Sequence, residues 1–185
     1  IKNSVTIPDS ATEELISFFH DRLVVQLKDQ NIRHDVIKAV VAGGDDDLVR
    51  IVARAKAVQN FVVSMDGINL LAAYRRANNI VSIEEKKDNQ SYTGNVNPAL
   101  LQQDEEKKLF EKLENVVKPV TQYLAEEQFD MAGAILASLR APVDTFFERV
   151  MVNTDDNALR INRLNLLARI RTTLDTIANF SLIEG

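Results

Sequence analysis

Cysteine is absent from this sequence, and histidine occurs only twice, as His20 and His34. The chain therefore cannot form a disulfide, a thiolate metal site or a cysteine nucleophile, and this composition is typical of a reducing compartment. Two histidines are too few for a histidine-based metal site. No apolar run reaches the roughly 18 residues that a membrane span needs, and the N-terminus lacks the cationic and apolar regions of a signal peptide. These absences predict a soluble, cytoplasmic protein that has no metal site.

Catalytic sequence signatures are missing as well. There is no P-loop, Gly-rich dinucleotide turn, nucleophile elbow or His-Glu-x-x-His helix. The acidic clusters Asp45–Asp47 and Asp155–Asp156 could bind a hard cation, but both precede predicted helices, whose N-termini favour carboxylates. A net charge of −5 argues against a polybasic nucleic-acid binder, although a local cationic patch can still bind RNA. We expect no catalytic site and no cofactor in this chain, and neither DNA nor a membrane as a partner.

Helical periodicity is the strongest positive signal. The sequence has 185 residues, 45% of them hydrophobic and 26% charged, which suits one domain with or without a helical appendage. No segment alternates apolar and polar residues long enough to predict a strand. The sequence therefore predicts an all-α bundle of about seven helices. The predicted helical segments are residues 10–30, 35–42, 48–62, 68–81, 104–127, 130–139, 142–151 and 156–179.

Capping residues, glycine and proline predict where these helical segments begin, end or are interrupted. Ser10–Glu13 reads as a capping box, Gly43-Gly44 ends the second helix, and Pro119 is expected to kink or interrupt the long helix around it. Residues 84–97 are polar and aperiodic, which predicts a flexible loop. The expected organisation is a helical connector over residues 1–44 and a helical domain over residues 45–185.

The first helix carries apolar residues at helical spacing, and we expect them to form one core-facing stripe. The members of this stripe are Leu15, Phe18, Phe19, Leu23 and Leu27.

The last helix has an apolar face with a cation in the middle of it. Arg163 falls among Leu159, Leu166, Leu167, Ile170, Leu174 and Ile177. A buried arginine needs a partner, because leaving a buried charge unpaired typically costs about 3 to 5 kcal/mol. The first predicted partner is Asp144 and the second is Glu148. The alternative is that the Arg163 guanidinium reaches through a gap to a phosphate.

Two strips of arginine and asparagine side chains are candidates for RNA contact, because these side chains commonly bind phosphates and base edges in RNA. No acidic residue interrupts the first strip between Arg160 and Arg171. An ordinary solvated helix face is the alternative for both strips. The first strip consists of Arg160, Asn162, Asn165, Arg169 and Arg171, and the second of Arg75, Arg76 and Asn79 with Arg50 and Arg54 on the preceding helix.

Four segments carry a resemblance to a known family. Residues 139–152 (LRAPVDTFFERVMV) and 156–167 (DNALRINRLNLL) resemble the C-terminal region of the β subunit of bacterial glycyl-tRNA synthetases. Residues 54–61 (RAKAVQNF) and 72–81 (AAYRRANNIV) are similar to the same subunit, in the same order. Family members often show a Lys-Arg pair where this sequence has Arg75 and Arg76.

The resemblance implies a DALR-type anticodon-binding domain that engages the tRNA for glycine. It also implies a heterotetrameric parent enzyme, in which the α subunit charges tRNA with glycine using ATP and Mg²⁺. The partners would then be that α subunit and the remainder of the β subunit. The opening Ile1, with no Met before it, suggests a piece of a larger chain. The alternative function is a helical subunit-interface or scaffold domain without direct RNA contact.

Overall fold

A computed structural model describes residues 9–184 of the chain. Side chains are described from Glu14 onward, except at Ile16 and His20. The predicted Ser10–Glu13 capping box and the side chain of His20 therefore lie outside the described residues.

Helices make up the ordered elements of the described chain, and residues 9–184 contain no strand, so the all-α prediction is confirmed. Eight α-helices occur in this range, close to the expected number. They are α1 (Asp9–Asp29), α2 (His34–Val41), α3 (Leu48–Val63), α4 (Met65–Asp88), α5 (Asp104–Ala125), α6 (Phe129–Ala137), α7 (Arg140–Arg149) and α8 (Asn157–Leu174), with the short 3-10 helices η1 (Pro98–Leu100) and η2 (Phe180–Leu182). None of the described helices combines the length and apolar character needed to cross a bilayer.

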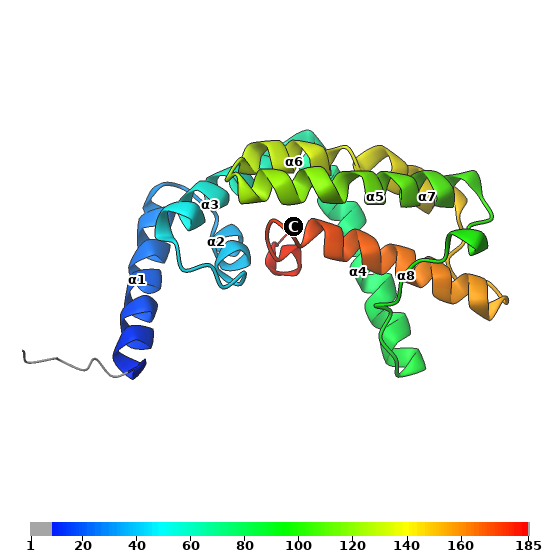
Figure 1. Ribbon diagram of the computed structural model, residues 1–185, viewed down its shortest axis with the longest axis horizontal. Helices are drawn as coiled ribbons and strands as arrows, with labels where there is room; N and C mark the ends of the chain where they lie inside the picture. Colours follow the sequence, from blue (N-terminus) through cyan, green and yellow to red (C-terminus); the bar gives the residue numbers. More distant parts are fainter. Residues whose placement is uncertain (1–8, 185) are drawn as a thin grey trace, which may run out of the picture.

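The helices pack as a bundle whose long axis follows α5 (Figure 1). The helices α6 and α7 run back along α5, and α8 lies on another side of it, crossed by α4 (Figure 1). The C-terminal η2 packs against both α2 and α4, so the end of the chain closes the core between the N-terminal helices and the rest. Phe180 of η2 is 1% exposed and packs edge-on against Tyr74.

Short polar side chains start several of these helices. Asp47 accepts hydrogen bonds from the amides of Val49 and Arg50, and Asp156 caps α8 in the same way, as the acidic clusters predicted. Between α3 and α4, Ser64 is the only non-helical residue, so residues 65–67, which lie between the predicted helices 48–62 and 68–81, are in fact the first turn of α4. This close junction requires glycine at position 67, because a Cβ there would lie 1.8 Å from the Phe61 carbonyl oxygen.

The prediction of a flexible loop over residues 84–97 is wrong for residues 84–88, which are helical. The helix α4 continues to Asp88 and ends at Asn89, whose φ of 49° is left-handed. The chain that follows is anchored, because Tyr92 is 2% exposed and packs in the core. A single buried aromatic in a polar segment creates no periodicity, so the sequence pattern could not reveal this anchor.

The predicted core stripe of α1 is correct for two of its five residues. Leu23 and Leu27 are buried, whereas Leu15, Phe18 and Phe19 are 54%, 52% and 45% exposed. The described contacts of α1 are with α2 and α3, which leave its first turns uncovered.

The predicted interruption of the long helix at Pro119 and the predicted end of the last helix at Asn179 were wrong. The helix α5 continues through Pro119 to Ala125 without interruption. The helix α8 ends at Leu174 rather than Asn179, since the chain turns there toward η2. The predicted stop at Gly43-Gly44 is confirmed, with Gly44 at a φ of 71°.

Candidate nucleic-acid interface

Arg163 is buried between α8 and α5 and is paired with Glu106. Its Nε lies 2.8 Å from Glu106 Oε1, and its Nη1 donates to the Met151 carbonyl oxygen at 2.7 Å. The two side chains are 5% and 0% exposed. The prediction of Asp144 as the partner, with Glu148 second, is therefore wrong. Asp144 sits on the outer side of α7, where its carboxylate lies 3.7 Å from Arg140 Nε, so Arg163 stabilises the fold and does not reach toward a phosphate.

Glu106 is positioned by its place at the beginning of α5. Its Oε2 accepts hydrogen bonds from the backbone amides of Gln103 and Gln102, at 2.8 and 3.1 Å. Burial alone would raise the pKa of this carboxyl, but the Arg163 guanidinium and the two amides outweigh burial and hold the pKa below its ordinary value. Glu106 is thus an ionised side chain that joins a helix start to the neighbouring helix.

Arg160 also makes contacts within the fold. Its guanidinium binds the carboxylates of Glu84 and Asp88 at the end of α4, and its Nε donates to Asn153 Oδ1 at 3.2 Å. The hydrogen bond from Arg160 holds the pKa of Glu84 below its usual value. Because the Arg160 side chain is only 13% exposed, its geometry favours a structural role over the predicted RNA contact.

Two other residues of the first strip also hold elements together. Asn162 is 3% exposed, accepts from the Asn97 amide at 2.7 Å and donates to the Asn97 carbonyl at 3.1 Å. Arg171 is half-buried, with Nη1 3.4 Å from Asn78 Oδ1 and Nη2 3.8 Å from Glu85. Asn162 therefore pins the loop before η1, and Arg171 ties α8 to α4.

Arg50 and Arg54 form a separate cluster around Asp45. Arg50 Nη2 lies 2.6 Å from Asp45 Oδ1, and Arg54 Nη2 lies 3.5 Å from Asp45 Oδ2. The Arg54 guanidinium also stacks over the ring of Phe129 at 5.0 Å. The hydrogen bond from Arg50 lowers the pKa of Asp45 to about 2. These contacts explain the role of Asp45, which lies two residues before the capping Asp47.

Asp45→Asn is expected to lower the free energy of unfolding by about 1 kcal/mol at neutral pH, since solvent screens a pair at the rim of the protein. A lowered folded-state pKa stabilises the fold above the ordinary value of 3.8 and loses that effect as the pH falls toward 2. Urea unfolding across this range should therefore show the difference between variant and parent closing in acid. Asp46→Asn is the control, because Asp46 is 85% exposed; a gap that stays constant down to pH 2 would contradict the assignment.

The second predicted strip is accessible in part. Arg76 is exposed and lies over the Phe147 ring, 4.3 Å from its centroid, and Asn79 is exposed one turn later on α4. Arg75 is half-buried, and its Nη2 donates weakly to the Ile183 carbonyl at 3.4 Å. Arg76 and Asn79 therefore stay available for a ligand.

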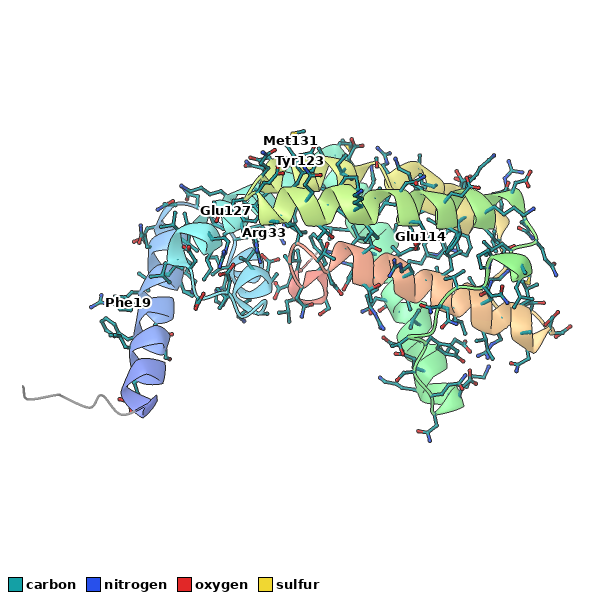
Figure 2. All side chains as sticks on the ribbon, in the orientation of Figure 1. Phe19, Arg33, Glu114, Tyr123, Glu127 and Met131 are labelled. Atoms are coloured by element: carbon teal, nitrogen blue, oxygen red, sulfur yellow. The ribbon has the colours of Figure 1, made fainter. Side chains whose placement is uncertain are left out.

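A cavity of about 360 Å³ opens between α5, α8 and the loop after α4. It brings together two residues of the first predicted strip, Asn165 and Arg169. Arg169 Nη2 donates to Glu114 Oε1 at 3.0 Å across the mouth of this cavity, and Figure 2 labels Glu114 where α5 faces α8. The cavity is lined by Tyr92, Thr93, Gly94, Asn95, Val96, Phe110, Glu114, Asn165, Ala168, Arg169 and Thr172.

The side-chain amide of Asn165 can donate and accept hydrogen bonds at the polar edge of a ligand. Among the described residues it makes no hydrogen bond, although it is half-buried in the cavity wall. The loop approaches closely here, since a Cβ at Gly94 would lie 3.2 Å from Asn165 Nδ2. Phe110, half-buried on α5, supplies an aromatic surface beside it. The sequence did not single out Phe110 or Glu114, because Phe110 follows Leu109 in an ordinary apolar pattern and Glu114 is one of many acidic residues.

The chain belongs to an all-α class of RNA-binding domains. The family described as the DALR anticodon binding domain matches residues 70–183, which include α5, α7, α8 and every residue that lines the cavity. This match covers more than half of the chain, and the chain is a member of that family.

Within that class, the chain is similar to glycine–tRNA ligase beta subunits, which confirms the resemblance of its motifs. It is 50% identical to the subunit of Rhodospirillum centenum over 98% of this chain and 26% of that protein. It is 45% identical to the subunit of Paracoccus denitrificans over 96% of this chain and 26% of that protein, and 47% identical to that of Cereibacter sphaeroides over 93% and 25%. The chain thus spans about a quarter of the length of these relatives.

Proposed function

We propose that this chain binds the anticodon loop of the tRNA for glycine, as part of the β subunit of a cytoplasmic glycine–tRNA ligase. The observation that carries the proposal is the cavity between α5 and α8, in which an aromatic ring, an unpaired amide and an arginine converge within residues 70–183. Bases of single-stranded RNA are commonly held by such stacking and edge contacts.

One unpaired base would enter the cavity and stack on Phe110. The amide of Asn165 offers a donor and an acceptor to the edge of that base. Arg169 would leave Glu114 and bind the adjoining phosphate, and this exchange costs little because the Arg169 and Glu114 side chains are 40% and 48% exposed. Glu114, once released, can accept a hydrogen bond from a base amino group.

The net charge of −5 is compatible with this proposal. A small cationic patch can discriminate one RNA without attracting every RNA, whereas a strongly basic surface binds phosphate nonspecifically. Arg76 and Asn79 would contact the RNA backbone outside the cavity. Charging of the tRNA with glycine, with ATP and Mg²⁺, would take place on the α subunit of a heterotetramer.

Phe110→Leu is expected to weaken binding of a glycine anticodon stem-loop by about tenfold, because stacking of one base on an aromatic ring contributes about 1 to 3 kcal/mol. Leucine keeps most of the apolar volume, so the fold should be retained. Asn165→Ala should act in the same direction through the lost edge contact. Fluorescence anisotropy with a labelled stem-loop, at several salt concentrations, measures both effects.

Tyr123→Leu is the matched control, since Tyr123 is a half-buried aromatic on the same helix that does not line the cavity. Equal losses for Phe110→Leu and Tyr123→Leu would place the RNA elsewhere on the protein. If the parent chain shows no affinity for the stem-loop even at low salt, anticodon binding is wrong and a scaffold role replaces it. The exposed apolar face of α1 is the observation that favours this second function.

A further inference from the structure

The helix α1 leaves the bundle and extends away from it (Figure 1). Only its second half is covered, where Leu23 and Leu27 are 6% and 0% exposed against the core. The turns before Leu23 have no neighbouring helix among the described residues. A projecting helix without tertiary contacts is only marginally stable on its own.

A second apolar face runs along this projecting helix, on a side different from the one that meets the bundle. It consists of Leu15, Phe18, Phe19 and Val25, which are 54%, 52%, 45% and 56% exposed. At 100° per residue these positions fall within an arc of about 120°, beside the arc that holds Leu23 and Leu27. We call these four residues the outer face of α1.

The aromatic side chains of the outer face gather into one exposed cluster. The rings of Phe18 and Phe19 pack edge to face with centroids 5.8 Å apart, and the Arg22 guanidinium lies 5.5 Å from the centre of the Phe18 ring. Figure 2 shows Phe19 pointing away from the bundle. Clustered exposed apolar residues of this kind mark interaction surfaces, whereas single exposed ones are ordinary.

We propose that the outer face of α1 docks onto an apolar surface of the rest of the glycine–tRNA ligase β subunit. Relatives about four times as long align with 98% of this chain, so the alignment includes α1 and leaves about three quarters of their length outside. A domain on the same polypeptide is present at an effective concentration in the millimolar range. This inference rests on the proposed place of the chain in that subunit, but not on RNA binding.

The charges beside the outer face argue against RNA as the occupant. Glu14 and Asp21 are both exposed and border the face on its Val25 side, and their carboxylates would repel phosphates. Arg22, which lies on the same side of the helix, is stacked on Phe18. An exposed aromatic cluster with an arginine stacked on it and carboxylates along one border is instead typical of a protein interface.

The test compares hydrogen exchange of α1 in two settings. One is the isolated chain, and the other is the full-length Rhodospirillum centenum subunit in which this chain replaces the matched quarter. We expect amides around Phe18 and Phe19 to exchange at least tenfold more slowly in the full-length subunit. Phe18→Glu with Phe19→Glu should abolish this protection, and Leu15→Glu should reduce it. Val49→Glu is the control, because Val49 is 78% exposed on α3.

Three outcomes would overturn the proposal. The first is equally fast exchange in both settings, the second is protection that appears only when tRNA is added, and the third is a dimer of the isolated chain that Phe18→Glu dissolves in sedimentation experiments. The variants change exposed side chains, so an unchanged melting temperature of the isolated chain verifies that they fold. Stem-loop affinity of the same variants separates the two ideas, since docking can fail while anticodon binding persists.

Discussion

Glu106→Ala is expected to lower the free energy of unfolding by about 3 to 5 kcal/mol, because it leaves the buried charge of Arg163 without its counter-ion. The remaining partner would be the Met151 carbonyl, 2.7 Å from Arg163 Nη1. The variant also removes the acceptor for the amides of Gln102 and Gln103 at the beginning of α5. Urea unfolding at neutral pH, followed by circular dichroism, measures the loss.

Two controls isolate the effect of burial. Glu114 lies on the same helix as Glu106, and Glu114→Ala breaks its ion pair with Arg169 of α8. Because the Glu114 side chain is 48% exposed, a change in stability within about 1 kcal/mol is expected. Asp144→Ala should be equally mild, because Asp144 does not contact Arg163. The double replacement Glu106→Leu with Arg163→Met should recover much of the stability, since an apolar pair of similar size often substitutes for a buried ion pair. A Glu106→Ala variant that unfolds like the parent would refute the structural role.

Arg160→Ala is expected to lower the free energy of unfolding by about 1.5 to 3 kcal/mol, the typical range for hydrogen bonds that involve charged groups. Glu84, whose side chain is 8% exposed, would keep the hydrogen bond from Asn153 Nδ2 at 3.0 Å and an exposed cation, Lys87 Nζ, at 3.6 Å. The contact between the beginning of α8 and the end of α4 would loosen. Urea unfolding measures the stability, and stem-loop binding of the folded variant should stay within about twofold of the parent.

Arg149→Ala provides the comparison, because Arg149 is exposed on α7 and should change stability by less than about 0.5 kcal/mol. Arg160→Lys should recover only part of the loss, since an ammonium group cannot bridge two carboxylates and an amide as the planar guanidinium does. If Arg160→Ala instead unfolds normally but loses the stem-loop, then Arg160 contacts RNA and its assignment to the fold is wrong.

Helix positions and their caps followed from the sequence because they depend on neighbours along the chain. Asp47 and Asp156 cap helices that begin one residue later, and the left-handed Gly44 follows the second helix. The motifs in α4, α7 and α8 were long enough to indicate the family, and the comparisons with relatives agree with it.

The candidate site was predictable only in part. Asn165 and Arg169 were correctly placed on the same surface, and the structure adds Phe110 and Glu114 from a helix more than fifty residues away. Arg160 and Asn162 are also an arginine and an asparagine of the first strip, but they contact the fold itself. Arg160 binds α4, and Asn162 binds the loop before η1. A helical wheel shows which residues share a face, but it does not show which element covers that face.

The sequence by itself determined the helical class, the approximate helix positions, the absence of cysteine chemistry and the need of Arg163 for a carboxylate. Only the tertiary structure decided that this carboxylate is Glu106, 57 residues earlier, and that Leu15, Phe18 and Phe19 stay exposed. The physical reason is the distance along the chain over which each kind of interaction acts. Helix periodicity and capping act over about four residues, whereas the partner of a buried charge depends on how whole helices cross. In this fold that crossing separates the arginines that hold the bundle together from those available for RNA.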